Sequence, residues 1–130
     1  MKILLADDHG LFRDSMATWL QQYPESMEIQ FASDWASLTT QLDPKLALIM
    51  LDLGMPGMTG PNSIGELLKL LPTVPILVVS ANDEPLTINA CFESGASGYI
   101  TKASNGCEIL KAVSIVLNGG MYQPLAASQN

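Results

Sequence analysis

The chain has 130 residues, of which 48% are hydrophobic and 15% are charged, and its formal net charge is −7. This length and composition fit one domain with a buried core and exclude a disordered segment. The negative charge argues against non-specific binding of this chain to nucleic acid or anionic lipid, and its longest apolar runs are too short to span a bilayer.

The first elements alternate between strand and helix. Residues 2–6, KILLA, form a continuous apolar run, which is typical of a strand covered on both faces. Apolar residues at helical spacing predict a helix over residues 11–23, closed by Pro24. Residues 27–32, MEIQFA, alternate between apolar and polar side chains, which predicts a half-buried edge strand.

A short helix and a buried strand come next. Ser33 or Asp34 can cap a helix that stops at Asp43, before Pro44. The apolar residues of this helix are Trp35, Leu38 and Leu42. The run LALIML at 46–51 then predicts a central strand, buried on both faces.

The second half of the chain continues the alternation. A helix follows the central strand and ends before Pro72. Its apolar face consists of Ile64, Leu67, Leu68 and Leu71. The run PILVVS at 75–80 predicts another buried strand, and residues 84–95 predict a weaker helix with Pro85 in its first turn and Gly95 at its end.

A last strand and a last helix complete the pattern. Residues 98–101, GYIT, predict a short strand, and the helix after it stops at Asn118. The apolar face of this helix consists of Ile109, Val113, Val116 and Leu117. Five strands that alternate with five helices indicate right-handed crossovers, and therefore an α/β fold in which helices wind doubly around a five-stranded parallel sheet.

Polar side chains gather where the predicted strands end. In an open parallel sheet, the functional crevice lies outside the carboxyl ends of the strands. The residues that follow the strands there are Asp7, Asp8, Asp52, Ser80, Thr101 and Lys102. We therefore expect three carboxylates, a hydroxyl group and an amine to meet at one end of the sheet.

These groups fit together chemically only with a cation. Three neighbouring carboxylates repel one another, and Mg²⁺ removes that repulsion because it prefers oxygen ligands. Asp52 is the only charged residue between Lys45 and Glu66, and an aspartate carboxylate can act as a nucleophile that forms an acyl phosphate. Lys102 can supply a positive charge and Ser80 a hydrogen bond to the transferred group. The set of groups therefore matches an aspartyl-phosphate site.

Four blocks of the sequence carry a resemblance to a known family. They are LLADDHGLFRD, LIMLDLGMPGMTG, ILVVSAND and ASGYITKAS. In order and spacing they resemble the receiver domain of two-component response regulators, over residues 1–122. The resemblance implies a flavodoxin-like receiver fold with strand order 2-1-3-4-5. DDHGLFRD and the closing VLNGGMYQP look most like the subfamily that joins the receiver to a helix-turn-helix DNA-binding output domain.

The resemblance also implies a role for each matching residue. Asp52 is the implied phosphoacceptor, which takes its phosphoryl group from a histidine kinase. Lys102 and Ser80 are implied to contact the phosphoryl group, and Tyr99 matches the aromatic residue that switches orientation with Ser80. The implied Mg²⁺ ligands are Asp7, Asp8, Asp52 and the backbone carbonyl of Gly54. Such a domain catalyses only its own phosphorylation and dephosphorylation.

Partners and location follow from the same resemblance. We expect a histidine kinase as the donor, a homodimer on phosphorylation, and contact with DNA only through an output domain outside this chain. We expect no membrane partner. Cys91 and Cys107 have no metal-like spacing and fit a reducing cytoplasm. Residues 1–122 are the expected receiver domain, and the tail at 123–130 has no periodicity and is typical of a linker that begins there.

Other functions stay open on the residues alone. A phosphatase with an aspartate nucleophile uses the same groups, but it typically has a second acid where this chain has Gly54. A flavodoxin-like cofactor domain needs a phosphate-binding loop after the first strand, where this chain has Asp7 and Asp8. A degenerate receiver docks partners without phosphotransfer.

The site residues also have simpler structural interpretations. Asp7 and Asp8 can cap the following helix, Ser80 can cap a turn, and Tyr99 can be a packing residue. We interpret His9 as a local polar contact and not as a metal ligand, because Mg²⁺ prefers oxygen.

Overall fold

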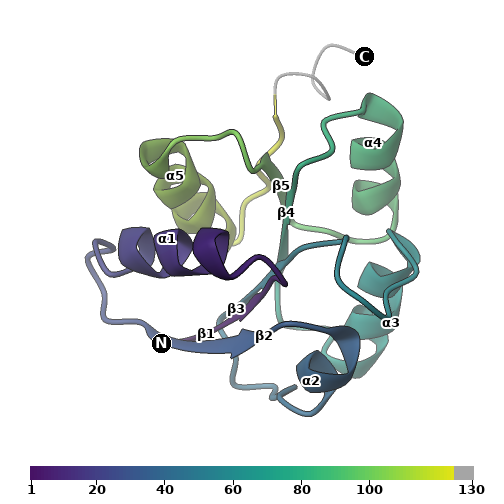
Figure 1. Cartoon of the computed structure of the whole chain (residues 1–130), viewed down its shortest axis with the longest axis horizontal. Helices are drawn as coiled ribbons and strands as arrows, with labels where there is room; N and C mark the ends of the chain where they lie inside the picture. Colours follow the sequence, from purple (N-terminus) through teal and green to yellow (C-terminus); the bar gives the residue numbers. More distant parts are fainter. Residues whose placement is uncertain (125–130) are drawn as a thin grey trace.

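Five parallel strands form the centre of the molecule, in the order β2-β1-β3-β4-β5 (Figure 1). The computed structural model describes residues 1–124. The strands are β1 (Lys2–Ala6), β2 (Glu28–Ala32), β3 (Leu48–Leu51), β4 (Ile76–Ser80) and β5 (Gly98–Thr101). The order reverses direction at β1, so the ends of β1 and β3 lie side by side at the centre of the sheet. The predicted fold and strand order are confirmed.

Five helices cover the two faces of this sheet. They are α1 (Gly10–Leu20), α2 (Trp35–Thr39), α3 (Asn62–Leu70), α4 (Pro85–Glu93) and α5 (Gly106–Leu117). Figure 1 shows α1 and α5 together on one face, and α2, α3 and α4 on the other. The longest described helix has 12 residues, and none of the described helices has the length and apolar character needed to cross a membrane.

Two hydrophobic layers fill the space between sheet and helices. In β1, Ile3 and Leu5 belong to the layer under α1 and α5, whereas Leu4 and Ala6 belong to the layer under the other three helices. This division follows from the alternation of side chains along a strand. Both faces of the central strands are therefore buried, which explains their continuous apolar sequences.

Two helices are shorter than the sequence predicts. α1 ends at Leu20 and not at Tyr23, because the N–H groups of Gln22 and Tyr23 donate to carbonyls three residues back, at 3.0 and 3.1 Å, and tighten the last turn. α2 ends at Thr39, whose hydroxyl also donates to a carbonyl three residues back. Leu42 therefore lies outside the helix, although it still packs against the core.

The start of α2 and both ends of α4 follow the signals predicted from the sequence. Of the two candidate caps for α2, Asp34 is the one that acts, and its Oδ1 accepts a hydrogen bond of 2.7 Å from the Ser37 N–H. Pro85 lies in the first turn of α4, and Gly95 follows this helix with a φ of 107°, a conformation that favours glycine.

The chain after α5 adds one more contact to the sheet. Tyr122 pairs in parallel with Gly98: its N–H donates to the Ser97 carbonyl at 3.1 Å, and its own carbonyl accepts the Tyr99 N–H at 3.0 Å. This segment has no periodicity in the sequence, because a single bridge leaves no alternating pattern. Residues 125–130 of the predicted tail lie outside the described residues.

Candidate functional site

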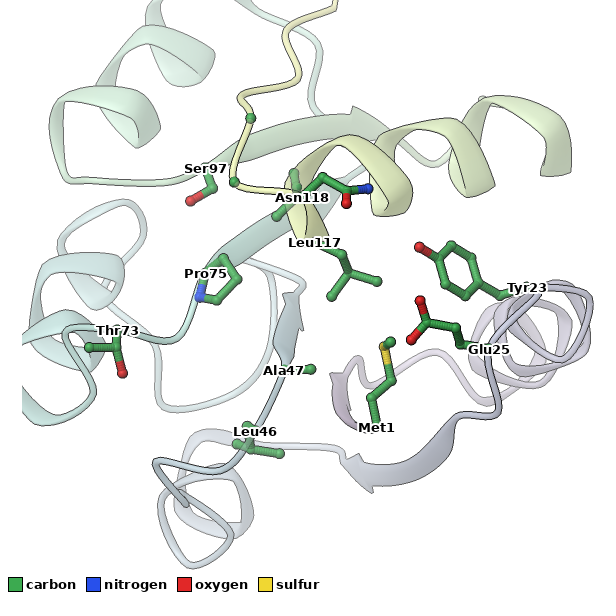
Figure 2. A pocket seen from close by; sticks show the side chains of 13 residues that line it. Met1, Tyr23, Glu25, Leu46, Ala47, Thr73, Pro75, Ser97, Leu117 and Asn118 are labelled. Carbon is green, nitrogen blue, oxygen red and sulfur yellow. The ribbon is translucent and has the colours of Figure 1, made fainter.

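One pocket of about 540 Å³ lies at the amino-terminal end of the sheet (Figure 2). Its lining residues Met1, Ala47, Pro75 and Ser97 each stand directly before a strand. The only carboxylate side chain in the lining is Glu25, which Figure 2 shows beside Tyr23 and Leu117. This pocket is at the opposite end of the sheet from the predicted site residues at the carboxyl ends of the strands, which are Asp7, Asp8, Asp52, Ser80 and Lys102. Its shape is therefore no guide to the chemistry that the sequence predicts.

The carboxyl ends of β1 and β3 place two acids in the interior. The Asp7 N–H donates to the Ala32 carbonyl and the Asp52 N–H to the Ala6 carbonyl, each at 2.9 Å, so both residues extend the strand ladders by one step. Their exposed fractions are only 1% for Asp7 and 4% for Asp52. Asp52 Oδ1 accepts a 2.9 Å hydrogen bond from the Gly54 N–H, which fixes the orientation of the carboxylate.

Lys102 reaches this pair from the end of β5. Its backbone N–H donates to the Ser80 carbonyl at 2.9 Å, which anchors the start of the loop. Its Nζ lies 3.2 Å from Asp52 Oδ2 and 3.0 Å from Asp7 Oδ2. The Phe12 ring lies beneath the ammonium group, at 4.9 Å from its centroid. The predicted convergence of Asp7, Asp52 and Lys102 is thus observed.

The acidic cluster also has the properties of a cation site. One ligand atom each from Asp7, Asp8, His9 and Asp52 lies within 4.8 Å of the others. Asp7 Oδ2 is buried and accepts no hydrogen bond from any described residue, although Lys102 Nζ is near it. A buried carboxylate oxygen without a donor is costly unless a cation faces it. These residues therefore fit a divalent cation, and the Gly54 carbonyl as a further ligand stays a prediction.

His9 makes the local polar contacts that the sequence predicts, and these contacts place its ring in the acidic cluster. Its Nδ1 lies 3.2 Å from Asp7 Oδ1, 3.3 Å from Asp8 Oδ1 and 2.8 Å from Lys102 Nζ. Its backbone N–H also donates to Asp7 Oδ1 at 2.8 Å, which holds the residue beside the acid pair. In the sequence, the position of His9 directly after two aspartates indicates that the residue lies near them. That position does not determine the direction in which the ring points.

Ser80 and Tyr99 meet at the loop between β4 and α4. Ser80 Oγ accepts a 3.1 Å hydrogen bond from the Asn82 N–H, and the Tyr99 hydroxyl donates to the Asn82 carbonyl. Tyr99 is fully buried, and this burial raises the pKa of its phenol. Ser80 and Asn82 line a groove of about 350 Å³ that Gly54 also lines, so Ser80 faces the loop after Asp52. Asn82 is thus a structural link between the two predicted switch residues.

Comparisons with known proteins find several that are similar to this chain. The pattern of the response regulator receiver domain matches residues 3–114 of the chain. A glycerol metabolism activator of Pseudomonas putida is 40% identical over 126 residues, which cover 95% of this chain and 57% of that protein. The transcriptional regulatory protein DegU of Brevibacillus brevis is 30% identical over 125 residues, which cover 94% of this chain and 52% of that protein.

A solved structure extends the similarity to the fold. A two-component response regulator of the LuxR family from an Aurantimonas species superposes with a TM-score of 0.88 at 23% identity, over 98% of this chain and 92% of that one. The chain spans somewhat more than half the length of the two curated relatives, 57% and 52%.

Proposed function

We propose that this chain, which belongs to the response regulator receiver domain family, accepts a phosphoryl group from a histidine kinase on Asp52. Receiver domains are signalling modules of two-component systems, and this chain is one of them. The proposal adds the acceptor residue, the donor and the chemistry, which catalyses only the domain's own phosphorylation and dephosphorylation.

The observation that carries the proposal is the environment of the Asp52 carboxylate. Gly54 fixes one of its oxygens and Lys102 lies 3.2 Å from the other, at the centre of the strand ends. In the proposed step, a carboxylate oxygen attacks phosphorus and forms an O–P bond. The P–N bond to the kinase histidine breaks, and its electron pair stays on the imidazole nitrogen. Lys102 then lies where it can pair with the phosphoryl oxygens.

Asp7, Asp8 and Asp52 are the residues that would hold Mg²⁺, together with the Gly54 carbonyl. When bound, Mg²⁺ neutralises negative charge on the phosphoryl oxygens. The buried Asp7 Oδ2 that accepts no described hydrogen bond supports this assignment, because it faces the same cluster. Asp7 and Asp8 would position the cation, and the burial of Asp7 and Asp52 excludes water from their far sides.

The switch is proposed to run from Ser80 to Tyr99 through Asn82. A phosphoryl group on Asp52 offers a new acceptor to the Ser80 hydroxyl. When the Ser80 side chain turns toward this acceptor, the Asn82 N–H loses its own acceptor, which is Ser80 Oγ in this structure. Asn82 also accepts from the Tyr99 hydroxyl, so a change in this loop changes the environment of the buried ring.

The output of the whole protein is part of the proposal as well. DegU is described as a transcriptional regulatory protein, and the chain covers 52% of it. We infer that the chain acts in the cytoplasm within a longer regulator, in which an output domain contacts DNA and phosphorylation favours a homodimer.

The experiment that tests the proposal is phosphorylation by a small donor. The protein is incubated with Mg²⁺ and acetyl phosphate, and its intact mass is measured. We expect one adduct of about 80 Da that is stable in acid and lost in alkali, and that does not form after EDTA treatment. Asp52→Asn abolishes it, whereas Asp14→Asn, a matched change at an exposed aspartate of α1, leaves it intact. An adduct of equal yield in Asp52→Asn contradicts the proposal.

A further inference from the structure

We propose that His9 completes a mixed nitrogen and oxygen ligand set with Asp7, Asp8 and Asp52 that binds Zn²⁺ or a similar first-row transition metal and blocks phosphorylation while the metal is bound. The blocking rests on the proposed function of Asp52. The binding does not, because it depends only on the four side chains.

The spacing of the ligand atoms matches a tetrahedral metal site. His9 Nδ1 lies 3.2 Å from Asp7 Oδ1, 3.3 Å from Asp8 Oδ1 and 3.7 Å from Asp52 Oδ2. Two ligands of a tetrahedral Zn²⁺ with bonds near 2.0 Å are separated by about 3.3 Å. All four ligand atoms lie within 4.8 Å of one another, so side-chain rotations that shorten the wider separations bring the four residues to bonding distance from one central ion.

A cation already lies among these atoms, which shows that they are arranged around positive charge. Lys102 Nζ is 2.8 Å from His9 Nδ1, 3.0 Å from Asp7 Oδ2 and 3.2 Å from Asp52 Oδ2. The contact with Lys102 places the Nδ1 edge of the imidazole, and not its carbon edge, toward the carboxylates. Asp7 Oδ2 is buried, and no donor among the described residues meets hydrogen-bond geometry with it, although Lys102 Nζ lies 3.0 Å away. A metal ion can replace the ammonium group, because lysine has a long, flexible side chain.

The ligand chemistry separates two classes of ion at this one cluster. Mg²⁺ is a hard, octahedral ion that uses the carboxylates, keeps several water positions and gains little from imidazole. Zn²⁺ binds both imidazole nitrogen and carboxylate oxygen and is satisfied by four ligands. Four protein ligands fill the coordination shell of a tetrahedral ion and leave no position for a phosphoryl oxygen. Zn²⁺ at this cluster therefore excludes the reaction that Mg²⁺ supports.

His9 is accessible for such a role. Its side chain is 66% exposed, whereas those of Asp7 and Asp52 are 1% and 5% exposed. The imidazole thus forms the outer wall of the cluster, where a metal ion arrives from solvent. Its ring is not needed to fill the core, so its replacement leaves the fold intact.

The chain has one histidine, which makes the test unambiguous. Long-range ¹H–¹⁵N spectra of tag-free protein record both ring nitrogens during additions of Zn²⁺ or Mg²⁺. The background is Cys107→Ser, because an exposed thiol can also bind Zn²⁺. We expect Zn²⁺ to shift the Nδ1 resonance strongly and Mg²⁺ to leave the ring in its metal-free form.

The matched variant is His9→Asn, which exchanges the ring nitrogen for an amide of similar reach. Equilibrium dialysis is expected to show Zn²⁺ affinity lowered about tenfold or more, with Mg²⁺ affinity changed by about twofold or less. An unshifted Nδ1, or equal Zn²⁺ affinity in the two proteins, overturns the binding proposal.

A phosphorylation assay separates this inference from the proposed function. With Mg²⁺ and acetyl phosphate alone, labelling of the parent protein tests the function of Asp52. Each protein is compared with its own labelling in Mg²⁺ alone, and added Zn²⁺ is expected to halve labelling of the parent at a concentration about tenfold lower than the one that halves labelling of His9→Asn. Labelling that persists in the parent with Zn²⁺ bound overturns the blocking, while failure of labelling with Mg²⁺ alone overturns the proposed function and not the metal site.

Discussion

At the scale of single residues, the Lys102 ammonium group contributes to stability because it faces two buried carboxylates. The exposed fractions of Asp7 and Asp52 are only 1% and 4%, and Lys102 Nζ lies within 3.2 Å of a carboxylate oxygen of each. Such a group stabilises the protein because ionised carboxylates cannot remain buried without a partner. It also competes with any metal ion for the same oxygens.

Removal of this charge gives the first prediction. Lys102→Met lowers the free energy of unfolding in metal-free buffer by about 2 kcal/mol, because the carboxylates lose a charged donor. The same change increases the stabilisation gained from Mg²⁺, since the ion no longer displaces an ammonium group. Urea unfolding with and without Mg²⁺ measures both effects. Lys69→Met, at an exposed position in the last turn of α3, is the matched control. A variant as stable as the parent without metal contradicts this account.

The two cysteines differ in burial, and so in reactivity. Burial raises the pKa of the Cys91 thiol from 9.0 to about 11, whereas Cys107 is exposed. Because this pKa is raised in the folded state, the buried neutral thiol contributes stability below pH 9, and that contribution is lost as the pH rises toward 11. We expect iodoacetamide at pH 8 to add one group to the native protein, at Cys107, and two in urea. Equal native rates at both thiols would rule out this difference.

At the scale of elements, the packing of α1 against α5 depends on one glycine. A Cβ atom at Gly106 would lie 1.9 Å from Trp19, whereas a Cβ at Gly65 in α3 meets nothing within 4 Å. Gly106→Ala is therefore expected to lower the free energy of unfolding by about 1–3 kcal/mol through overpacking. Gly65→Ala is expected to raise it by about 0.5–1 kcal/mol, because alanine favours the helix interior. Thermal unfolding of both variants gives the sign of each change in the free energy of unfolding. The same sign for both variants refutes the packing argument.

The strands could be predicted because a strand that is buried on both faces consists of a continuous run of apolar residues. The helix ends were harder. The apolar spacing of α1 continues to Tyr23 after the helix has ended at Leu20, because a tightened last turn keeps similar side chains facing the core. The single bridge at Tyr122 left no pattern, since one residue cannot alternate.

At the scale of the whole molecule, topology explains why the acids and the lysine could be predicted together. Residues that follow parallel strands meet at one edge of the sheet, however far apart they lie in the sequence. The positions of His9 and Asn82 could not be predicted in this way. The role of His9 depends on where a ring in a loop points, and that of Asn82 on two hydrogen bonds of a loop.

The same topology couples the site to the rest of the domain. Asp52 follows a central strand, Tyr99 belongs to the edge strand β5, and Lys102 follows that strand. The Tyr99 N–H donates to the carbonyl of Tyr122 in the segment after α5. The segment after α5 is therefore hydrogen-bonded to the strand that precedes Lys102. This arrangement suits a domain that transmits a local chemical change.

The central claim is that Asp52 itself carries the phosphoryl group, and reductive trapping tests it most directly. Protein treated with acetyl phosphate and Mg²⁺ is reduced with borohydride, which converts a phosphorylated aspartate into homoserine, and its peptides are sequenced by mass spectrometry. We predict homoserine at position 52 and unchanged aspartate at positions 7 and 8. Homoserine at Asp7 or Asp8, or none at Asp52 in protein that carries the adduct, contradicts the account.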